Sequence, residues 1–140
     1  MIMRHVETLF CDDIRHEVGG KLTFIGVYSG VLFVPAFPLT LSKLCLSVRI
    51  VLPADTSFRV LRLSVIRDDE VLQEIALDEE PSEAQRKEPI QVTQFMLVFS
   101  PIRFDHPCTL RVRVQTEDGE LHGLPLQIDS TPSPVNGDPK

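Results

Sequence analysis

Strict alternation of apolar and polar side chains is the feature that most constrains how this chain can fold. Residues 108–115 read CTLRVRVQ, so every second side chain is apolar. Residues 44–50 read LCLSVRI and alternate in the same way. Because successive side chains of a β-strand point to opposite faces, this period of two predicts two strands that each have one buried and one solvated face.

Strand-like segments recur along most of the chain. They are expected at residues 4–11, 21–33, 43–52, 57–67, 70–77, 90–100, 108–117 and 120–128. Short strands punctuated by turn residues, without a long helical pattern, are typical of a β-sandwich or barrel. We therefore predict an all-β fold, an eight-stranded antiparallel Greek-key β-sandwich that is immunoglobulin-like or C2-like. The chain has no Trp, so the Cys, Trp and Cys pattern of a true immunoglobulin domain is missing.

Turns and long connections shape the expected topology. Residues 67–70 (RDDE) join the fourth strand to the fifth, and residues 117–120 (EDGE) contain an Asp-Gly pair that favours a tight hairpin. Residues 34–43 and 78–89 are expected to be long surface connections. Pro125 has no backbone N–H to donate, so the last strand is expected to lie at a sheet edge or to be bulged.

The chain length of 140 residues fits one domain. We expect a single β-sandwich domain over residues 1–128. A disordered tail is expected over residues 129–140, because this segment contains three prolines and few apolar side chains.

The charge balance and the cysteine content narrow the classes of ligand and location. The net charge is −6, and residues 78–88 carry half of it. Since nucleic-acid binders need a basic excess to neutralise phosphates, we expect no nucleic-acid ligand. We also expect no membrane span and no secretory signal, because no apolar run is long enough for either. Three cysteines without paired spacing favour a reducing compartment, so a cytoplasmic location is expected.

Residues 11–28 (CDDIRHEVGGKLTFIGVY) form the most distinctive segment of the chain. A tight turn at residues 19–20 would place Glu17 opposite Leu22 and would set charge on an apolar face. A slip in register or a longer loop avoids this conflict, so residues 12–20 are expected to form a structured connection rather than a regular hairpin arm.

The same segment resembles the N-terminal signature of a family of small uncharacterised bacterial proteins of about this length. The resemblance is concentrated in the N-terminal part of the chain. It implies a bacterial origin and a domain of unknown function, and it transfers no activity to any residue.

Two groups of charged residues are candidate partner-binding surfaces. The first group lies in the distinctive segment and consists of Asp12, Asp13, Arg15, Glu17 and Lys21. The second group points away from the expected core and consists of Arg49, Arg111 and Arg113. If these arginines share a sheet face, they suit recognition of a carboxylate or a phosphate. Internal ion pairing of the first group and simple solvation of the second are the alternative interpretations.

Other residues offer weaker chemistry. Asp68 and Asp69 are similar to the aspartate loops by which C2-like domains hold calcium, although aspartate is also a favoured turn residue. Cys11 lies near His16, as a nucleophile lies near its base, but a small buried cysteine is the competing interpretation. The histidines and cysteines lack the spacing of metal ligands. We therefore predict no catalytic residue, no metal site and no cofactor.

The sequence favours binding over catalysis. We expect a non-catalytic protein-binding or adaptor module whose partner is another protein or a second copy of the chain. An apolar corner formed by Phe33, Val34, Phe37 and Leu39 either closes one end of the sandwich or serves as an interface. The alternatives are a C2-like calcium- or lipid-binding module and a small hydrolase or isomerase.

Overall fold

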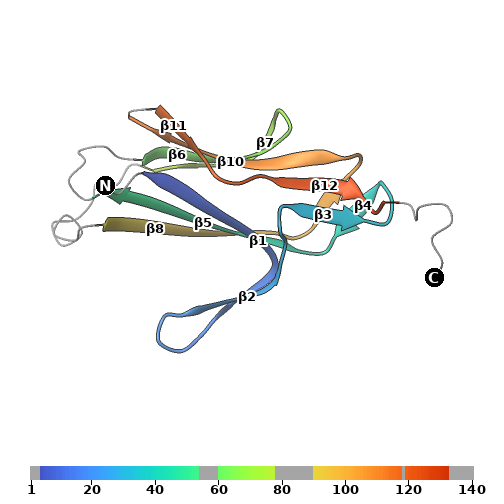
Figure 1. The fold of residues 1–140 in the computed structure, drawn as a ribbon, viewed down its shortest axis with the longest axis horizontal. Coiled ribbons are helices and arrows are strands. Elements are labelled where there is room, and N and C mark those ends of the chain that lie inside the picture. The colour runs from blue at the N-terminus through green and yellow to red at the C-terminus, as the bar shows by residue number, and fades with distance from the viewer. Residues whose placement is uncertain (1–3, 54–59, 78–89, 118, 133–140) are drawn as a thin grey trace.

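The computed structural model describes residues 4–53, 60–77, 90–117 and 119–132 (Figure 1). All of its regular secondary structure consists of β-strands. They are β1 (His5–His16), β2 (Leu22–Val27), β3 (Val31–Val34), β4 (Leu39–Leu41), β5 (Leu44–Pro53), β6 (Val60–Arg67), β7 (Glu70–Ala76), β8 (Ile90–Phe99), β9 (Ile102–Phe104), β10 (Cys108–Thr116), β11 (Gly119–His122) and β12 (Leu126–Ser130). No helix occurs within these ranges. The predicted all-β class is confirmed, and the described residues form twelve strands where eight were expected of the chain.

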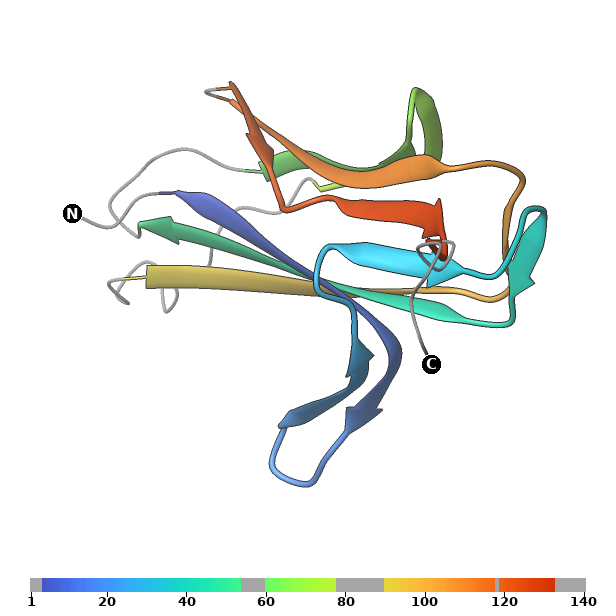
Figure 2. The same ribbon diagram turned by 45° about the vertical axis from the view of Figure 1, so that its right-hand side comes forward.

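Two large sheets face each other (Figures 1 and 2). The first sheet has the antiparallel order β2-β1-β5-β8. The second sheet has the order β3-β12-β10-β6-β7, with β11 also paired to β10. Its pairs are antiparallel except that β3 runs parallel to β12. A separate two-stranded sheet of β4 and β9 lies near one end of these layers.

The core lies between the two large sheets. Leu46, Val48 and Ile50 of β5 point into it, and Leu110 and Val112 of β10 meet them from the opposite layer. The alternation predicted for β10 is confirmed, since its arginines face outward. In β5 only Arg49 of the outer face is exposed, whereas Cys45 and Ser47 are buried between the neighbouring strands β1 and β8, so the predicted solvated face is wrong there. Since all five apolar side chains are fully buried, each contributes on the order of 2 kcal/mol to folding.

Two expected strands are each divided in the structure. The segment 21–33 separates into β2 and β3, and the segment 120–128 separates into β11 and β12. Pro125 lies in the second gap, directly before β12. Its missing N–H therefore removes no ladder bond, and β12 is paired on both sides, with β10 and β3. β12 is therefore not the expected edge strand, and the break at Pro125 between β11 and β12 takes the place of the expected alternative, a bulge.

The turn predicted at residues 67–70 is confirmed, and the hairpin predicted at residues 117–120 forms one residue earlier. Arg67 pairs with Glu70 across the turn between β6 and β7, where Asp68 adopts a φ of 51°. Aspartate tolerates this left-handed conformation better than most residues do. At the second turn Thr116 pairs with Gly119, which joins β10 to β11. Both turns thus connect neighbouring antiparallel strands.

Residues 12–16 are a regular hairpin arm, so the expectation of a structured connection is wrong for them, whereas residues 17–20 form the longer loop that was the alternative to a tight turn. β1 continues to His16 and pairs with β2, placing His16 opposite Leu22 and Ile14 opposite Phe24. Glu17 N donates to Lys21 O at 2.7 Å and closes a three-residue loop. The longer loop slips the register by one residue relative to a tight turn, so Leu22 faces His16 in place of Glu17, and Ile14 faces Phe24. Figure 2 shows this hairpin projecting away from both layers.

The predicted domain boundary at residue 128 falls inside a strand. Asp129 and Ser130 belong to β12, and Thr131 N donates to Val34 O at 2.8 Å. The ladder with β3 therefore extends the fold past the expected start of the tail, whereas residues 133–140 lie outside the described residues.

The apolar corner mainly closes one end of the layers. Val34 is buried in the core, and Phe37 and Leu39 pack against it. Phe33 instead points outward and is exposed. The connection expected over residues 78–89 lies outside the described residues.

Candidate functional site

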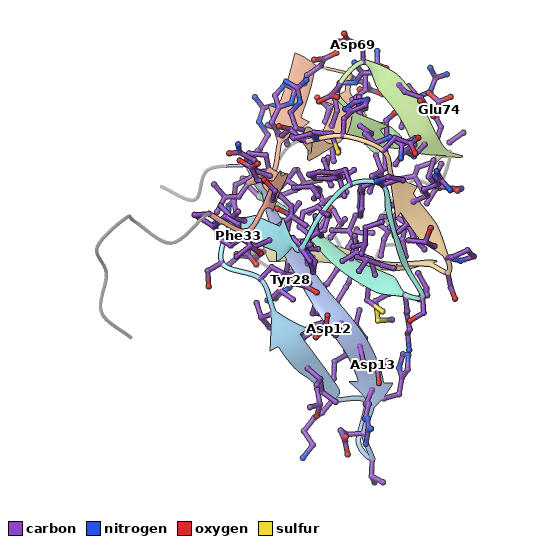
Figure 3. All side chains as sticks on the ribbon, turned by 90° about the vertical axis from the view of Figure 1, so that its right-hand side faces the viewer. Asp12, Asp13, Tyr28, Phe33, Asp69 and Glu74 are labelled. Carbon is purple, nitrogen blue, oxygen red and sulfur yellow. The ribbon has the colours of Figure 1, made fainter. Side chains whose placement is uncertain are left out.

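The base of the hairpin is held by a tyrosine and an aspartate. Tyr28 Oη donates to Asp12 Oδ1, and Tyr28 N donates to Phe10 O at 2.9 Å (Figure 3). Burial, followed by the hydrogen bond to Asp12, raises the pKa of Tyr28 to about 12. Because Phe10 is a core residue, Tyr28 links the start of the projecting hairpin to the interior.

A second contact holds the opposite face of the hairpin base. Lys43 Nζ donates to Asp13 Oδ1, and Arg15 Nε lies 3.5 Å from Asp13 Oδ2. The hydrogen bond from Lys43 holds the pKa of Asp13 below its usual range and raises the pKa of Lys43. Lys43 was missed as a site residue, because only the pairing of β1 with β5 brings it beside Asp13.

The far part of the hairpin carries the remaining charged candidates. Thr23 Oγ1 donates to Glu17 Oε1 at 3.2 Å, and Lys21 closes the loop through its backbone carbonyl. Val18 stands at the tip with 93% of its surface exposed. The structure therefore brings the five predicted residues onto one hairpin, with Asp12 and Asp13 at its base.

The three arginine candidates do not share a face. Arg49 lies on the outer face of the first sheet, where its Nη1 is 3.5 Å from Glu7 Oε1. Arg111 and Arg113 lie on the outer face of the second sheet. The predicted common basic face is wrong, because a shared core separates the two sheets and their outer faces point in opposite directions.

The arginines of the second sheet also have partners within the fold. Arg111 Nη2 donates to the main-chain oxygen of Asp68 at 3.0 Å. Arg113 Nε lies 3.9 Å from Glu120 Oε1. The first contact holds the turn between β6 and β7 against β10, and the second joins β10 to its neighbour β11.

A polar recess of about 480 Å³ lies at the turn between β6 and β7 and is lined by residues 67–70 together with Asp105, His106 and Cys108. Asp68 Oδ1 accepts from Thr109 N at 3.1 Å, so this carboxylate already braces the turn. Within the described ranges, no three His, Cys, Asp or Glu side chains are gathered to hold a metal ion. Figure 3 places Asp69 at the end of the molecule opposite Asp12 and Asp13.

The cysteines are buried and poorly ionised. Cys11 of β1 lies opposite Cys45 of β5, and Cys11 Sγ donates to Asp13 O at 3.4 Å. Burial, followed by the neighbouring Cys45, raises the pKa of Cys11 to about 11, and burial also raises the pKa of Cys45. A catalytic thiol needs a lowered pKa, so the surroundings of Cys11 are those of a packing residue.

Exposed apolar side chains gather at both margins of the first sheet. Ile25 and Val27 lie on β2 at one margin, and Val92, Met96 and Val98 lie on β8 at the other. The β8 group was missed in the sequence, although the uncharged run IQVTQFMLVF is a visible signal. Large apolar groups left on a surface mark contact regions when they are contiguous.

The comparisons with known proteins identify a family and no activity. Across the ranges that the structure describes, no helix is long and apolar enough to cross a membrane. No curated protein and no solved structure matches the chain significantly. The sequence model of a family of unknown function, DUF6941, matches residues 7–129, which confirms the resemblance to a family of uncharacterised proteins. This match covers nearly the whole described fold, and the chain therefore belongs to the DUF6941 family.

Proposed function

We propose that this protein is a non-catalytic protein-binding module that contacts its partner through the hairpin of β1 and β2, residues 12–27. The observation that carries the proposal is the projection of this hairpin beyond both layers with apolar side chains exposed along it. An isolated two-stranded hairpin is only marginally stable in water. Contact with a partner would therefore stabilise this long exposed hairpin.

The hairpin base is prepared for this role. Asp12 is held by Tyr28 on one face, and Asp13 is held by Lys43 on the other. The two contacts orient the hairpin before a partner binds, and this lowers the entropic cost of binding. We therefore assign the predicted residues Asp12 and Asp13 a positioning role.

The outer part of the hairpin supplies the contact surface. Apolar side chains lie on both faces of the hairpin: Ile14, Leu22 and Phe24 are partly buried on one face, and Ile25 is exposed on the other. Val18 extends the apolar surface to the tip. Arg15, Glu17 and Lys21 flank these side chains. Apolar anchors within a charged rim are typical of protein interfaces, so the partner we infer presents an apolar recess bordered by polar groups.

We infer further that the two layers have an immunoglobulin-like, Greek-key topology. The order β1-β5-β8 in one layer and β12-β10-β6-β7 in the other supports this inference. It corresponds to strands A, B and E facing strands G, F, C and C′ of such domains. In that frame the hairpin is an insertion between strands A and B, and surface loops on a rigid scaffold often carry binding residues.

Affinity capture from native lysate, read by mass spectrometry and repeated with the purified partner, tests the proposed function. The double variant Val18→Asp/Ile25→Asp places charge on the hairpin surface and is expected to lose the partner. The matched control is Val71→Asp, which adds charge at an exposed valine of β7 in the second sheet. A partner that binds the hairpin variant and the wild type equally would refute the proposal.

A further inference from the structure

β8 is a sheet margin without the usual protection against pairing. It is ten residues long, and within the described residues it pairs with β5 alone. Its sequence, IQVTQFMLVF, contains no charged residue, no proline and no glycine. Its ladder with β5 runs in register from Leu44 opposite Phe99 to Pro53 opposite Ile90, without a bulge. Free edge strands normally carry lysine, proline, a bulge or a very short length, because such features prevent association.

The other margins of the two large sheets each have one of these features. β7 carries Glu70 and Glu74 and has an irregular register against β6. β3 is only four residues long. β2 is interrupted by Gly26, whose φ is 69°. Among the described strands, β8 is therefore the long, regular and uncharged edge.

We propose that β8 pairs antiparallel with β8 of a second copy of this chain, with Gln94 at the two-fold axis. The occupant is indicated by the symmetry of the strand itself. Its four exposed apolar side chains lie two and four positions on either side of Gln94, at Ile90, Val92, Met96 and Val98. A two-fold axis at Gln94 sets Ile90 against Val98 of the second copy and Val92 against Met96.

The pairing covers the surface that the fold leaves open. The four apolar side chains are 39% to 57% exposed and lie on the outer face of the first sheet. Residues opposite each other in an antiparallel pair share a face, so each apolar side chain meets an apolar neighbour. On the inner face, Thr93 is set against Phe95 of the second copy, and Gln91 against Leu97. Phe95 and Leu97 pack against the core but are only partly buried at this margin.

Charge also favours a second copy as the occupant. Self-pairing brings two identical strands together, so any charged residue at the axis would face its own copy. β8 has no such residue and places the neutral amide of Gln94 at that position. Gln94 Nε2 donates to Ser47 Oγ at 3.1 Å, which orients the side chain on the outer face. Pairing joins the first sheets of both copies into one continuous sheet.

Sedimentation equilibrium of the full chain over a wide concentration range tests the interface. The wild type is expected to have twice the monomer mass of 15.8 kDa. Gln94→Lys and Gln94→Glu each oppose like charges at the axis, so each variant alone is expected to be monomeric. An equimolar mixture of the two is expected to recover the dimer, because Lys then faces Glu. Gln73→Lys, the same change at an exposed position on β7, is the control and retains the dimer.

Folding of every variant is checked by circular dichroism and urea denaturation. A wild type that stays monomeric at every concentration overturns the proposal. A dimer that survives Gln94→Lys overturns the register, and a dimer that survives Val92→Lys/Met96→Lys overturns β8 as the interface. These results are independent of the hairpin, since Val18→Asp/Ile25→Asp is expected to leave the dimer mass unchanged.

Discussion

Gly26 lies opposite Asp12 across the hairpin, and a Cβ on Gly26 would sit 2.1 Å from Asp12 Oδ2. Its φ of 69° is left-handed, a conformation that L side chains rarely adopt. Both facts favour glycine at this position. The absent side chain leaves room for the Asp12 carboxylate, which in turn accepts the hydrogen bond from Tyr28.

Gly26→Ala is expected to destabilise the protein more than Gly20→Ala does. Gly20 also has a positive φ, of 76°, but its added Cβ would meet nothing within 4 Å. Gly20→Ala therefore measures backbone strain alone, which is expected to lower the free energy of unfolding by about 1 kcal/mol. In Gly26→Ala the displacement of Asp12 is expected to lower it by roughly a further 1–2 kcal/mol. Urea denaturation measures both. Equal losses would show that the contact with Asp12 is unimportant.

Ultraviolet titration is expected to report Tyr28 directly, because the chain contains one Tyr and no Trp. The expected pKa is about 12 in the folded protein, against an ordinary value of 10.0. Asp12→Asn removes the carboxylate that disfavours the phenolate. In this variant the titration midpoint of Tyr28 should fall toward the ordinary value while remaining raised by burial. An unchanged midpoint in this variant would contradict the contact between Tyr28 and Asp12.

Alkaline pH is expected to weaken the fold through Cys11. The thiol ionises near 9.0 in the unfolded chain and at a pKa of about 11 in the folded one. The contribution of the neutral thiol to the free energy of unfolding is therefore fully present below pH 9 and is lost as the pH rises toward 11, up to about 3 kcal/mol. Urea denaturation across this range should show a smaller decline for Cys11→Ala than for the wild type. Parallel declines would exclude Cys11 as a source of alkaline instability.

Acid pH is expected to remove the contact between Asp13 and Lys43. The pKa of Asp13 is lowered in the folded state, so its stabilisation is present above the ordinary value of 3.8 and is lost as the pH falls through the folded-state value. Lys43→Met should therefore be less stable than the wild type at neutral pH and should converge with it in acid. Lys21→Met, on the same hairpin, is the control. A stability gap that persists in acid would assign the effect of Lys43→Met to packing.

The secondary structure of two strands and two turns was predictable from local patterns. The alternation over 44–50 and 108–115 identified β5 and β10, and the acidic residues of 67–70 identified a turn. The hairpin was misjudged because its register depends on a three-residue loop that accommodates two glycines with positive φ. One extra loop residue moves every side chain of a strand to the other face, and composition alone does not specify the loop length.

The candidate site was only partly predictable. The charges of the hairpin were found, but Lys43 and the pairing of Cys11 with Cys45 depend on β1 lying beside β5. The common basic face failed for the same reason, since Arg49 and Arg111 lie in different sheets.

By itself, the sequence determined the extended backbone, the inward-facing residues of the most regular strands and the uncharged character of β8. Side-chain alternation is a local property of an extended chain, so it can be recognised without knowing which strands are neighbours. The tertiary structure alone decided the strand order, the contacts at the hairpin base and the position of β8 at a sheet margin. These features depend on the relative free energies of competing long-range pairings, to which distant parts of the chain contribute together.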